Sequence, residues 1–178
     1  MNTAIIETGA GFSGLCWTGE GLVVLNLPAP TLYDAENELR REIEKLPEIP
    51  GKSSGESGRV IDPKELEAEM QSYFSGKKVG LSFPVDWSCY TAFQRKVLQR
   101  VYSLKWGQAA SYGQIAADIG SLRAARAVGG AVGSNRVLLV IPCHRVLAHN
   151  RGIGGFGSGL DWKRKLLGFE GINFLEYD

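Results

Sequence analysis

Three side chains that can do chemistry stand next to one another at Cys143, His144 and Arg145. They follow residues 137–141, an apolar run that predicts a buried strand. A thiol at the end of a buried segment, beside histidine and arginine, is expected to have a lowered pKa and to act as a nucleophile. The alternative is an inert site, in which Cys143 packs as a small hydrophobic residue and His144 lies at the surface.

A reactive Cys143 needs a path for its proton. Neighbouring side chains on an extended segment point to opposite sides, so we expect a water molecule between Cys143 and His144 rather than a direct hydrogen bond. A carboxylate behind the imidazole would fix its tautomer, and Glu170 is a candidate for that place. Residues 150–159 contain five glycines. Such a loop exposes backbone N–H groups and lets a flat ligand approach closely.

The composition predicts a globular protein without a metal centre or a disulfide framework. The chain has 178 residues, of which 44% are hydrophobic and 22% charged, enough for one domain or two small ones. Cys16, Cys89 and Cys143 form no CxxC pair, so we expect no metal and no cofactor, and structural roles for the first two. No apolar run is long enough to span a membrane, and the N-terminus lacks the pattern of a signal peptide. We therefore expect a cytoplasmic protein.

Charge divides the chain into two unlike halves. Residues 1–84 carry 13 acidic and 8 basic side chains, whereas residues 85–178 carry 6 acidic and 12 basic ones. With the change in composition near residue 84, this predicts an N-terminal α+β domain over 1–84 and a second domain over 85–178. The basic excess of the second domain favours a polyanionic partner. Chance variation of surface charge is the alternative.

Residues 1–84 show alternating strand and helix signals. Asp62 followed by Pro63 predicts the start of a helix, and the turn-forming residues 18–21 between two apolar runs predict a hairpin. The expected elements are strands over 4–8, 14–17, 22–27 and 79–83, helices over 31–46 and 63–74, and a loop over 47–59.

Residues 85–178 show mainly helical signals. Thr91 and Ser111 are each placed to cap a helix, and Gly120 is placed to end the second one. A third helix is expected over 121–132. Two short helices joined by a tight glycine-containing turn resemble a helix-turn-helix, and αα-hairpins share this spacing. The apolar stripe of the first helix is expected at Phe93, Val97, Leu98, Val101 and Leu104.

A last amphipathic helix is predicted over 160–168. Its periodicity turns Leu166 and Leu167 inward and Lys163, Arg164 and Lys165 mostly outward.

The helix expected over 121–132 has little side-chain bulk around Arg126. Gly129 and Gly130 each cost a helix roughly 1 kcal/mol relative to alanine, which indicates that something approaches the helix closely. A packed neighbouring helix explains this equally well as a nucleic-acid groove, from which Arg126 would project.

The segment Ile141-Pro142-Cys143-His144-Arg145-Val146 resembles the acceptor motif of the O6-alkylguanine-DNA alkyltransferases, also called methylated-DNA–protein-cysteine methyltransferases. The resemblance covers about 80 residues, with several motifs in compatible spacing. The other matching segments are 111–114 (SYGQ), 124–131 (AARAVGGA), 134–135 (SN), 154–160 (GGFGSGL) and 169–171 (FEG). It implies an α+β fold with a ribonuclease H-like N-terminal domain and a mainly helical, winged-helix-like C-terminal domain that contains the helix-turn-helix.

The resemblance also implies a role for each matched catalytic residue. Cys143 would accept the alkyl group, and His144 with Glu170 would form a water-mediated relay that generates the thiolate. Tyr112 would rotate the target nucleotide by acting on its phosphate and would protonate the departing guanine. Asn135 would brace the turn between the recognition helix and the active site.

The implied partner is double-stranded DNA that bears O6-alkylguanine, bound through its minor groove by a monomer. Arg126 would fill the space left in the base stack when the damaged nucleotide is extruded. Ala127, Gly129 and Gly130, together with Tyr112, would complete this DNA-binding surface by letting the helix enter the groove.

The resemblance implies a substrate pocket at Val146, Phe156, Gly157 and Ser158. The last three stand where many members of the family have Tyr, Ser and Gly. A loop serine hydroxyl is therefore lost or moved by one position, which bears on how bulky an alkyl group is accepted.

The function implied is repair of DNA by irreversible, single-turnover transfer of an alkyl group from O6-alkylguanine, and possibly O4-alkylthymine, to Cys143. The alternative is an alkyltransferase-like protein that binds the lesion without transfer, but those proteins carry tryptophan in place of the cysteine. A cysteine hydrolase normally draws its cysteine and histidine from distant positions. Transcription regulators fused to this family carry an extra zinc-thiolate domain, for which cysteines are lacking here.

Overall fold

The computed structural model describes residues 1–47 and 61–176. They divide into two compact units. The first comprises residues 1–90 together with 136–140, and the second comprises 91–135 and 141–178. The loop expected over 47–59 lies, apart from Pro47, outside the described residues. Among the helices of the described ranges, none is both long and apolar enough to cross a bilayer.

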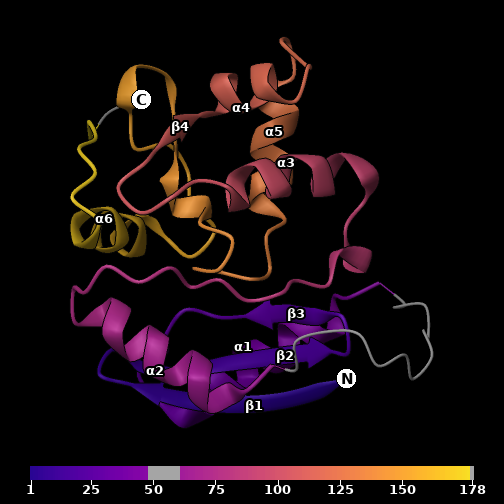
Figure 1. The fold of residues 1–178 in the computed structure, drawn as a ribbon, viewed down its shortest axis with the longest axis vertical. Coiled ribbons are helices and arrows are strands. Elements are labelled where there is room, and N and C mark those ends of the chain that lie inside the picture. The colour runs from indigo at the N-terminus through magenta and orange to yellow at the C-terminus, as the bar shows by residue number, and fades with distance from the viewer. Residues whose placement is uncertain (48–60, 177–178) are drawn as a thin grey trace. The chain divides into compact units, whose positions relative to one another are not determined.

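The first unit is built on a three-stranded antiparallel sheet in the order β1-β2-β3, seen at the foot of Figure 1. Its strands are β1 (Asn2–Thr8), β2 (Gly11–Thr18) and β3 (Gly21–Leu25). The predicted hairpin is confirmed, because Thr18 pairs with Gly21 across the turn. Residues 136–140 extend this unit: the N–H of Leu25 donates to the carbonyl of Arg136, and that of Leu138 to the carbonyl of Leu25.

Two helices of the first unit pack on the sheet, α1 (Leu32–Glu44) against β2 and α2 (Pro63–Phe74) against β1. Both begin where the sequence predicts, since the side chains of Thr31 and Asp62 accept hydrogen bonds from backbone N–H groups of the first turn. The inner face of α2 carries three buried residues. Tyr73 is buried there with Leu66 and Met70, whereas Phe74 is half-buried.

Three helices of the second unit pack against one another and stand together in Figure 1. Capping boxes start two of them, Thr91 with Gln94 and Ser111 with Gln114. The α-helices of this unit are α3 (Ala92–Tyr102), α4 (Tyr112–Asp118), α5 (Ala125–Gly133) and α6 (Leu160–Phe169). The expected stripe of the first helix is buried except at Phe93, which is 36% exposed.

Short elements connect the helices. A parallel pair of two-residue strands, β4 (Ala110–Ser111) and β5 (Val146–Leu147), joins the start of α4 to the segment after Cys143. The single-turn 3-10 helices are η1 (Trp87–Cys89), η2 (Cys143–Arg145) and η3 (His149–Arg151). The fold is α+β, as predicted.

Two of the predicted strands are wrong. Residues 79–83 form no strand, and only the following Val85 makes an isolated parallel bridge, with Leu22. In residues 137–141, Val137 bridges Leu25, but Leu139 has a φ of 68° and the chain turns there. The predicted burial is right, since Val137, Leu139, Val140 and Ile141 are all buried. An apolar run indicates burial, but it does not exclude a tight turn.

Gly14 of β2 permits the close approach of α1. A Cβ atom at this position would lie 2.7 Å from the Cβ of Leu39 and 3.3 Å from the carbonyl oxygen of Ala35. Gly14→Ala is therefore expected to destabilise the first unit by about 1–3 kcal/mol. The free energy of opening is measured by native-state hydrogen exchange at the amides of β1–β3. Gly19→Ala is the control, because its Cβ would meet no atom of the described residues within 4 Å. Equal effects of the two substitutions would contradict the packing argument.

Candidate active site

Cys143 is the first residue of η2 and is 5% exposed. The chain turns here: the N–H of Arg145 donates to the carbonyl of Pro142, and that of Cys143 to the carbonyl of Ile141. The extended backbone assumed in the sequence analysis is therefore wrong, and with it the argument that side chains 143 and 144 point to opposite sides.

The side chain of Asn135 holds both the turn and the thiol. Its Nδ2 lies 2.9 Å from the carbonyl oxygen of Ile141 and 3.1 Å from the Sγ of Cys143. Asn135 follows directly on Ser134, the C-cap of α5. One amide group thus links the end of α5 to the residue that carries the candidate nucleophile.

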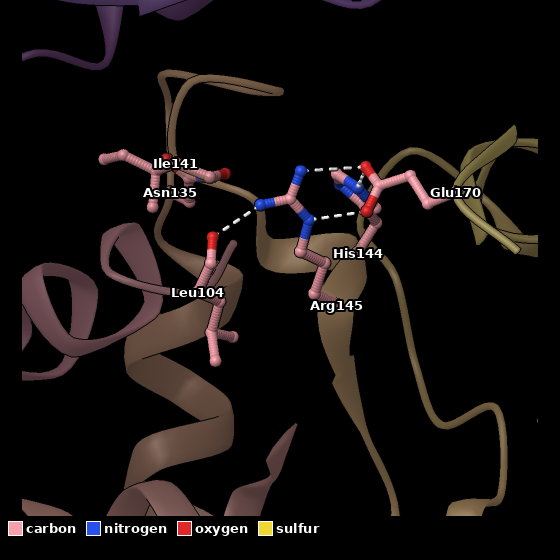
Figure 2. Close-up of polar contacts among 6 residues, drawn as sticks. All are labelled: Leu104, Asn135, Ile141, His144, Arg145 and Glu170. Carbon is pink, nitrogen blue, oxygen red and sulfur yellow. Dashed lines mark hydrogen bonds and ion pairs between the residues drawn. The ribbon is translucent and has the colours of Figure 1, made fainter. Parts of the chain in front are cut away.

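A buried cluster of charged groups follows Cys143 in the chain, on η2 and at the end of α6 (Figure 2). His144 Nε2 lies 2.7 Å from Glu170 Oε1. Arg145 binds the same carboxylate twice, with Nε 2.6 Å from Oε2 and Nη2 2.9 Å from Oε1. The guanidinium also donates through Nη1 to the carbonyl of Leu104. The side chains of His144 and Glu170 are 1% and 0% exposed, so these bonds form away from bulk solvent.

The charge states follow from these contacts. Burial alone would raise the pKa of Glu170, but hydrogen bonds from His144 and Arg145 outweigh it and lower that pKa to about 2. Burial lowers the pKa of His144 below its usual value. At neutral pH a carboxylate therefore faces a neutral imidazole. A carboxylate only accepts hydrogen bonds, so the proton is on Nε2 and the lone pair is on Nδ1. His144 can thus act as a base through Nδ1.

The pKa of the Cys143 thiol is shifted in the direction opposite to the one expected. Burial raises the pKa of Cys143, and the hydrogen bond from Asn135 and the positive charge of Lys163 only partly lower it again. The lowered pKa expected from neighbouring His144 and Arg145 is therefore wrong for this structure. The guanidinium of Arg145 is directed at Glu170, and the imidazole of His144 is neutral.

The environment of Lys163 differs from the one predicted from the sequence. Lys163 was expected to point outward, yet it is 0% exposed. Its Nζ lies 2.7 Å from the carbonyl oxygen of Val146 and 3.0 Å from that of Gly155. Helical spacing could have revealed this, because Lys163 lies three and four residues before the buried Leu166 and Leu167 and therefore shares their face. No partner was predicted from the sequence for Arg145, which binds Glu170 in the structure.

Tyr112 lies between α5 and the glycine-rich loop. It is half-buried at the start of α4. A Cβ at Gly129 would lie 3.8 Å from its ring, and one at Gly154, where φ is 62°, would lie 3.4 Å from it. Glycine at both positions therefore leaves room for the Tyr112 ring.

The small-residue face of α5 is open to solvent. Arg126, Ala127 and Gly130 are exposed, and Gly129 is half-buried. A Cβ at Gly130 would meet no described atom within 4 Å. A packed neighbouring helix therefore does not account for this glycine within the described residues.

The residues proposed to form the substrate pocket differ in their surroundings. Val146 is fully buried in β5. Phe156 is half-buried, and Gly157 and Ser158 are exposed in the turn before α6, where the N–H of Gly159 donates to the carbonyl of Phe156. The candidate pocket thus combines one buried residue, Val146, with three residues of a loop at the surface.

A buried thiol that is hydrogen-bonded by an amide, and that precedes a histidine paired with a carboxylate, is an arrangement that suits the class of proteins in which cysteine acts as a nucleophile. Known sequences narrow that class. Residues 92–172 match the family described as 6-O-methylguanine DNA methyltransferase, DNA binding domain. A methylated-DNA–protein-cysteine methyltransferase of Sulfurisphaera tokodaii is 41% identical over 109 residues, which are 61% of this chain and 68% of that protein. One of Haemophilus influenzae is 45% identical over 86 residues, 48% of each chain.

Solved structures agree with the sequence matches. The crystal structure of Mycobacterium tuberculosis OGT in complex with DNA matches with a TM-score of 0.69 and 26% identity, over 96% of this chain and 92% of that chain. An O6-methylguanine-DNA methyltransferase from Pyrococcus kodakaraensis matches with a TM-score of 0.65 and 27% identity, over 96% and 98%. The chain therefore belongs to the methylated-DNA–protein-cysteine methyltransferase family.

The buried carboxylate of Glu170 predicts how stability depends on pH. Its pKa is lowered from 4.5 to about 2 by folding, so its contribution is present above pH 4.5 and lost as the pH falls towards 2. That difference corresponds to roughly 3 kcal/mol. His144 adds to acid destabilisation, because its lowered pKa lets the unfolded chain take up a proton first as the pH falls below 6.5.

Glu170→Gln is therefore expected to destabilise the protein by about 3 kcal/mol at pH 7, with the difference from wild type shrinking as the pH approaches 2. Denaturant unfolding at a series of pH values measures it. Glu176→Gln is the control, because Glu176 is an exposed partner of Arg164 and its loss should cost far less. A pH-independent difference for Glu170→Gln would rule out the linkage.

Proposed function

We propose that this protein repairs DNA by direct reversal, moving an alkyl group from the O6 atom of guanine to the Sγ of Cys143. The observation that carries the proposal is the hydrogen-bonded thiol of Cys143 beside the buried His144–Glu170 pair, within the segment that matches the family. DNA binding and methyl transfer to a protein cysteine agree with what the related proteins are named for.

The chemistry is a displacement at a saturated carbon. The Cys143 proton passes through a water molecule to Nδ1 of His144, and the carboxylate of Glu170 stabilises the imidazolium that forms. The thiolate attacks the alkyl carbon, a carbon–sulfur bond forms, and the bond from carbon to O6 breaks. Tyr112 donates a proton to the departing guanine. The thioether has no hydrolytic exit, so each molecule acts once, on O6-alkylguanine.

The nucleotide must leave the base stack to reach a buried thiol. We assign α4 and α5 to a helix-turn-helix whose exposed small face, at Ala127, Gly129 and Gly130, enters the minor groove of double-stranded DNA. Arg126 is exposed at the start of α5 and would fill the vacated space in the stack. Asn135 would keep the end of α5 in register with Cys143 through its two hydrogen bonds.

The two proposed domains follow the boundary predicted from the sequence near residue 84. Residues 85–178 would be a winged-helix-like DNA-binding and alkyl-acceptor domain, and residues 1–84 a ribonuclease H-like domain. The protein would act as a monomer in the cytoplasm. Val146, Phe156, Gly157 and Ser158 would line the pocket for the alkylated base.

Intact-mass measurement tests the transfer. After incubation with an oligonucleotide that contains O6-methylguanine, the wild-type protein is expected to gain the mass of one methyl group, and Cys143→Ala none. Cys89→Ala is the matched control, since Cys89 is also a buried free cysteine and should leave the gain intact. If wild type binds the oligonucleotide with its mass unchanged, the protein senses lesions and does not repair them.

The role of Arg126 is tested by Arg126→Gly. Loss of the stack-filling side chain is expected to slow single-turnover transfer at saturating DNA by about tenfold or more, while Cys143 stays reactive towards small alkylating reagents. Arg123→Gly removes another exposed arginine, three residues away, and it should weaken DNA binding with little effect on the saturated rate. Equal saturated rates for Arg126→Gly and wild type would remove Arg126 from the mechanism.

A further inference from the structure

The chain after α6 lies along the first half of the glycine-rich loop, residues 150–153. The N–H of Leu175 donates to the carbonyl of Arg151, and the N–H of Ile153 donates to the carbonyl of Leu175, both at 2.8 Å. Gly152 and Leu175 form a parallel bridge between the two segments. The last residues of a domain are usually poorly ordered unless contacts hold them. These bonds therefore fasten residues 173–175, here called the C-terminal strap, to the loop.

Arg151 binds the strap with its side chain as well as with its backbone. Its Nε lies 3.1 Å from the carbonyl oxygen of Asn173, and its Nη2 lies 2.8 Å from the same oxygen. The planar fork of a guanidinium permits two donors to meet one acceptor in this way. Arg151 thus contacts the strap at two positions, Asn173 through its side chain and Leu175 through its own carbonyl.

The backbone at Arg151 is unusual for an arginine. Asn150 has a φ of 52° and Arg151 a φ of 63°, both in the left-handed region. Asparagine adopts this region far more readily than arginine does. A disfavoured conformation persists where its surroundings hold it, and such positions cluster at functional sites. The two side-chain bonds to Asn173 offset a backbone cost that asparagine or glycine at position 151 would largely avoid.

The loop held by the strap continues directly into the candidate pocket. Ile153 is buried and precedes Gly154, where φ is 62°. A Cβ at Gly154 would lie 3.4 Å from the Tyr112 ring and 3.3 Å from the backbone nitrogen of Ala148. Residues 156–158, which follow at once, are those proposed to line the pocket. The position of Ile153 therefore determines how closely this half of the loop approaches Tyr112.

We propose that Arg151 is a positioning residue that selects the size of the alkyl group. Its bonds to the strap hold residues 150–153, and through them the rest of the loop, close to Tyr112. Release of the strap lets the loop move away, which makes room for a larger group and reduces the advantage of a small one. The inference rests on the proposed function, because it assigns Arg151 to the site that accepts the alkyl group.

The first test is amide hydrogen exchange of the free protein, without DNA. Arg151→Asn removes the guanidinium but keeps a residue that suits the left-handed backbone, so loss of the contact is separated from backbone strain. The amides of residues 153–157 are expected to exchange about tenfold faster in this variant. Arg40→Asn is the matched control, because Arg40 is an exposed arginine of α1, and these amides should exchange there as in wild type. Unchanged exchange in Arg151→Asn overturns the proposal.

The second test compares the transfer of a small and a large alkyl group. Single-turnover rates are measured with oligonucleotides that contain O6-methylguanine or O6-benzylguanine. The ratio of the methyl rate to the benzyl rate is expected to fall about threefold or more in Arg151→Asn and to stay at the wild-type value in Arg40→Asn. A merely structural arginine would slow both transfers equally. An unchanged ratio together with faster exchange therefore also overturns the proposal.

Arg151→Lys covers a failure of Arg151→Asn to fold. It keeps the positive charge but replaces the two-pronged donor by a single amine, so exchange at residues 153–157 should again be faster and the rate ratio lower than in wild type. A wild-type ratio in a folded Arg151→Lys protein with faster exchange contradicts the proposal. Absence of transfer from both oligonucleotides in wild type would refute the proposed function, while faster exchange in Arg151→Asn would still support the hold of Arg151 on the loop.

Discussion

The buried negative charge of Glu170 is the constraint around which the second unit is arranged. Glu170 is the C-cap of α6, where the helix dipole disfavours an anion, and its side chain is removed from water. Arg145 offsets both costs with a two-pronged ion pair. Because Arg145 also donates to the carbonyl of Leu104, the end of α6, η2 and the chain after α3 meet at the guanidinium that binds this carboxylate. His144 is oriented as a consequence of that junction.

Burial has opposite effects on the reactant and the product of the proposed reaction. It raises the pKa of Cys143, so the free protein keeps its thiol mostly protonated and protected from adventitious chemistry. A thioether carries no charge, and burial therefore does not penalise the alkylated product. In the proposed reaction, an imidazole whose proton is fixed on Nε2 by Glu170 would supply the base that the buried thiol needs. The environment thus restrains the thiolate and favours the alkylated state.

Local signals in the sequence were sufficient for most helices. Asp62, Thr91 and Ser111 cap the helices that they were predicted to cap, because a cap depends on residues within one turn. The strand predicted over 137–141 is wrong. Its apolar composition predicts burial, which is right. The φ of 68° at Leu139, however, depends on contacts made elsewhere in the chain. Motifs named the residues of the candidate site, and their roles stay predictions. The direction of the shift in the pKa of Cys143 was predicted wrongly, because desolvation depends on the whole packed environment.

The two cations that sequence reasoning missed or misplaced show why such sites are hard to derive. Arg145 and Lys163 are both buried, and the partners that hold Lys163 are backbone carbonyls, which no side-chain pattern records. Arg145 binds the carboxylate of Glu170, whereas the two hydrogen bonds of Lys163 described above go to backbone carbonyls. The charge of Lys163 lowers the pKa of Cys143, but burial has the larger effect and the pKa stays raised.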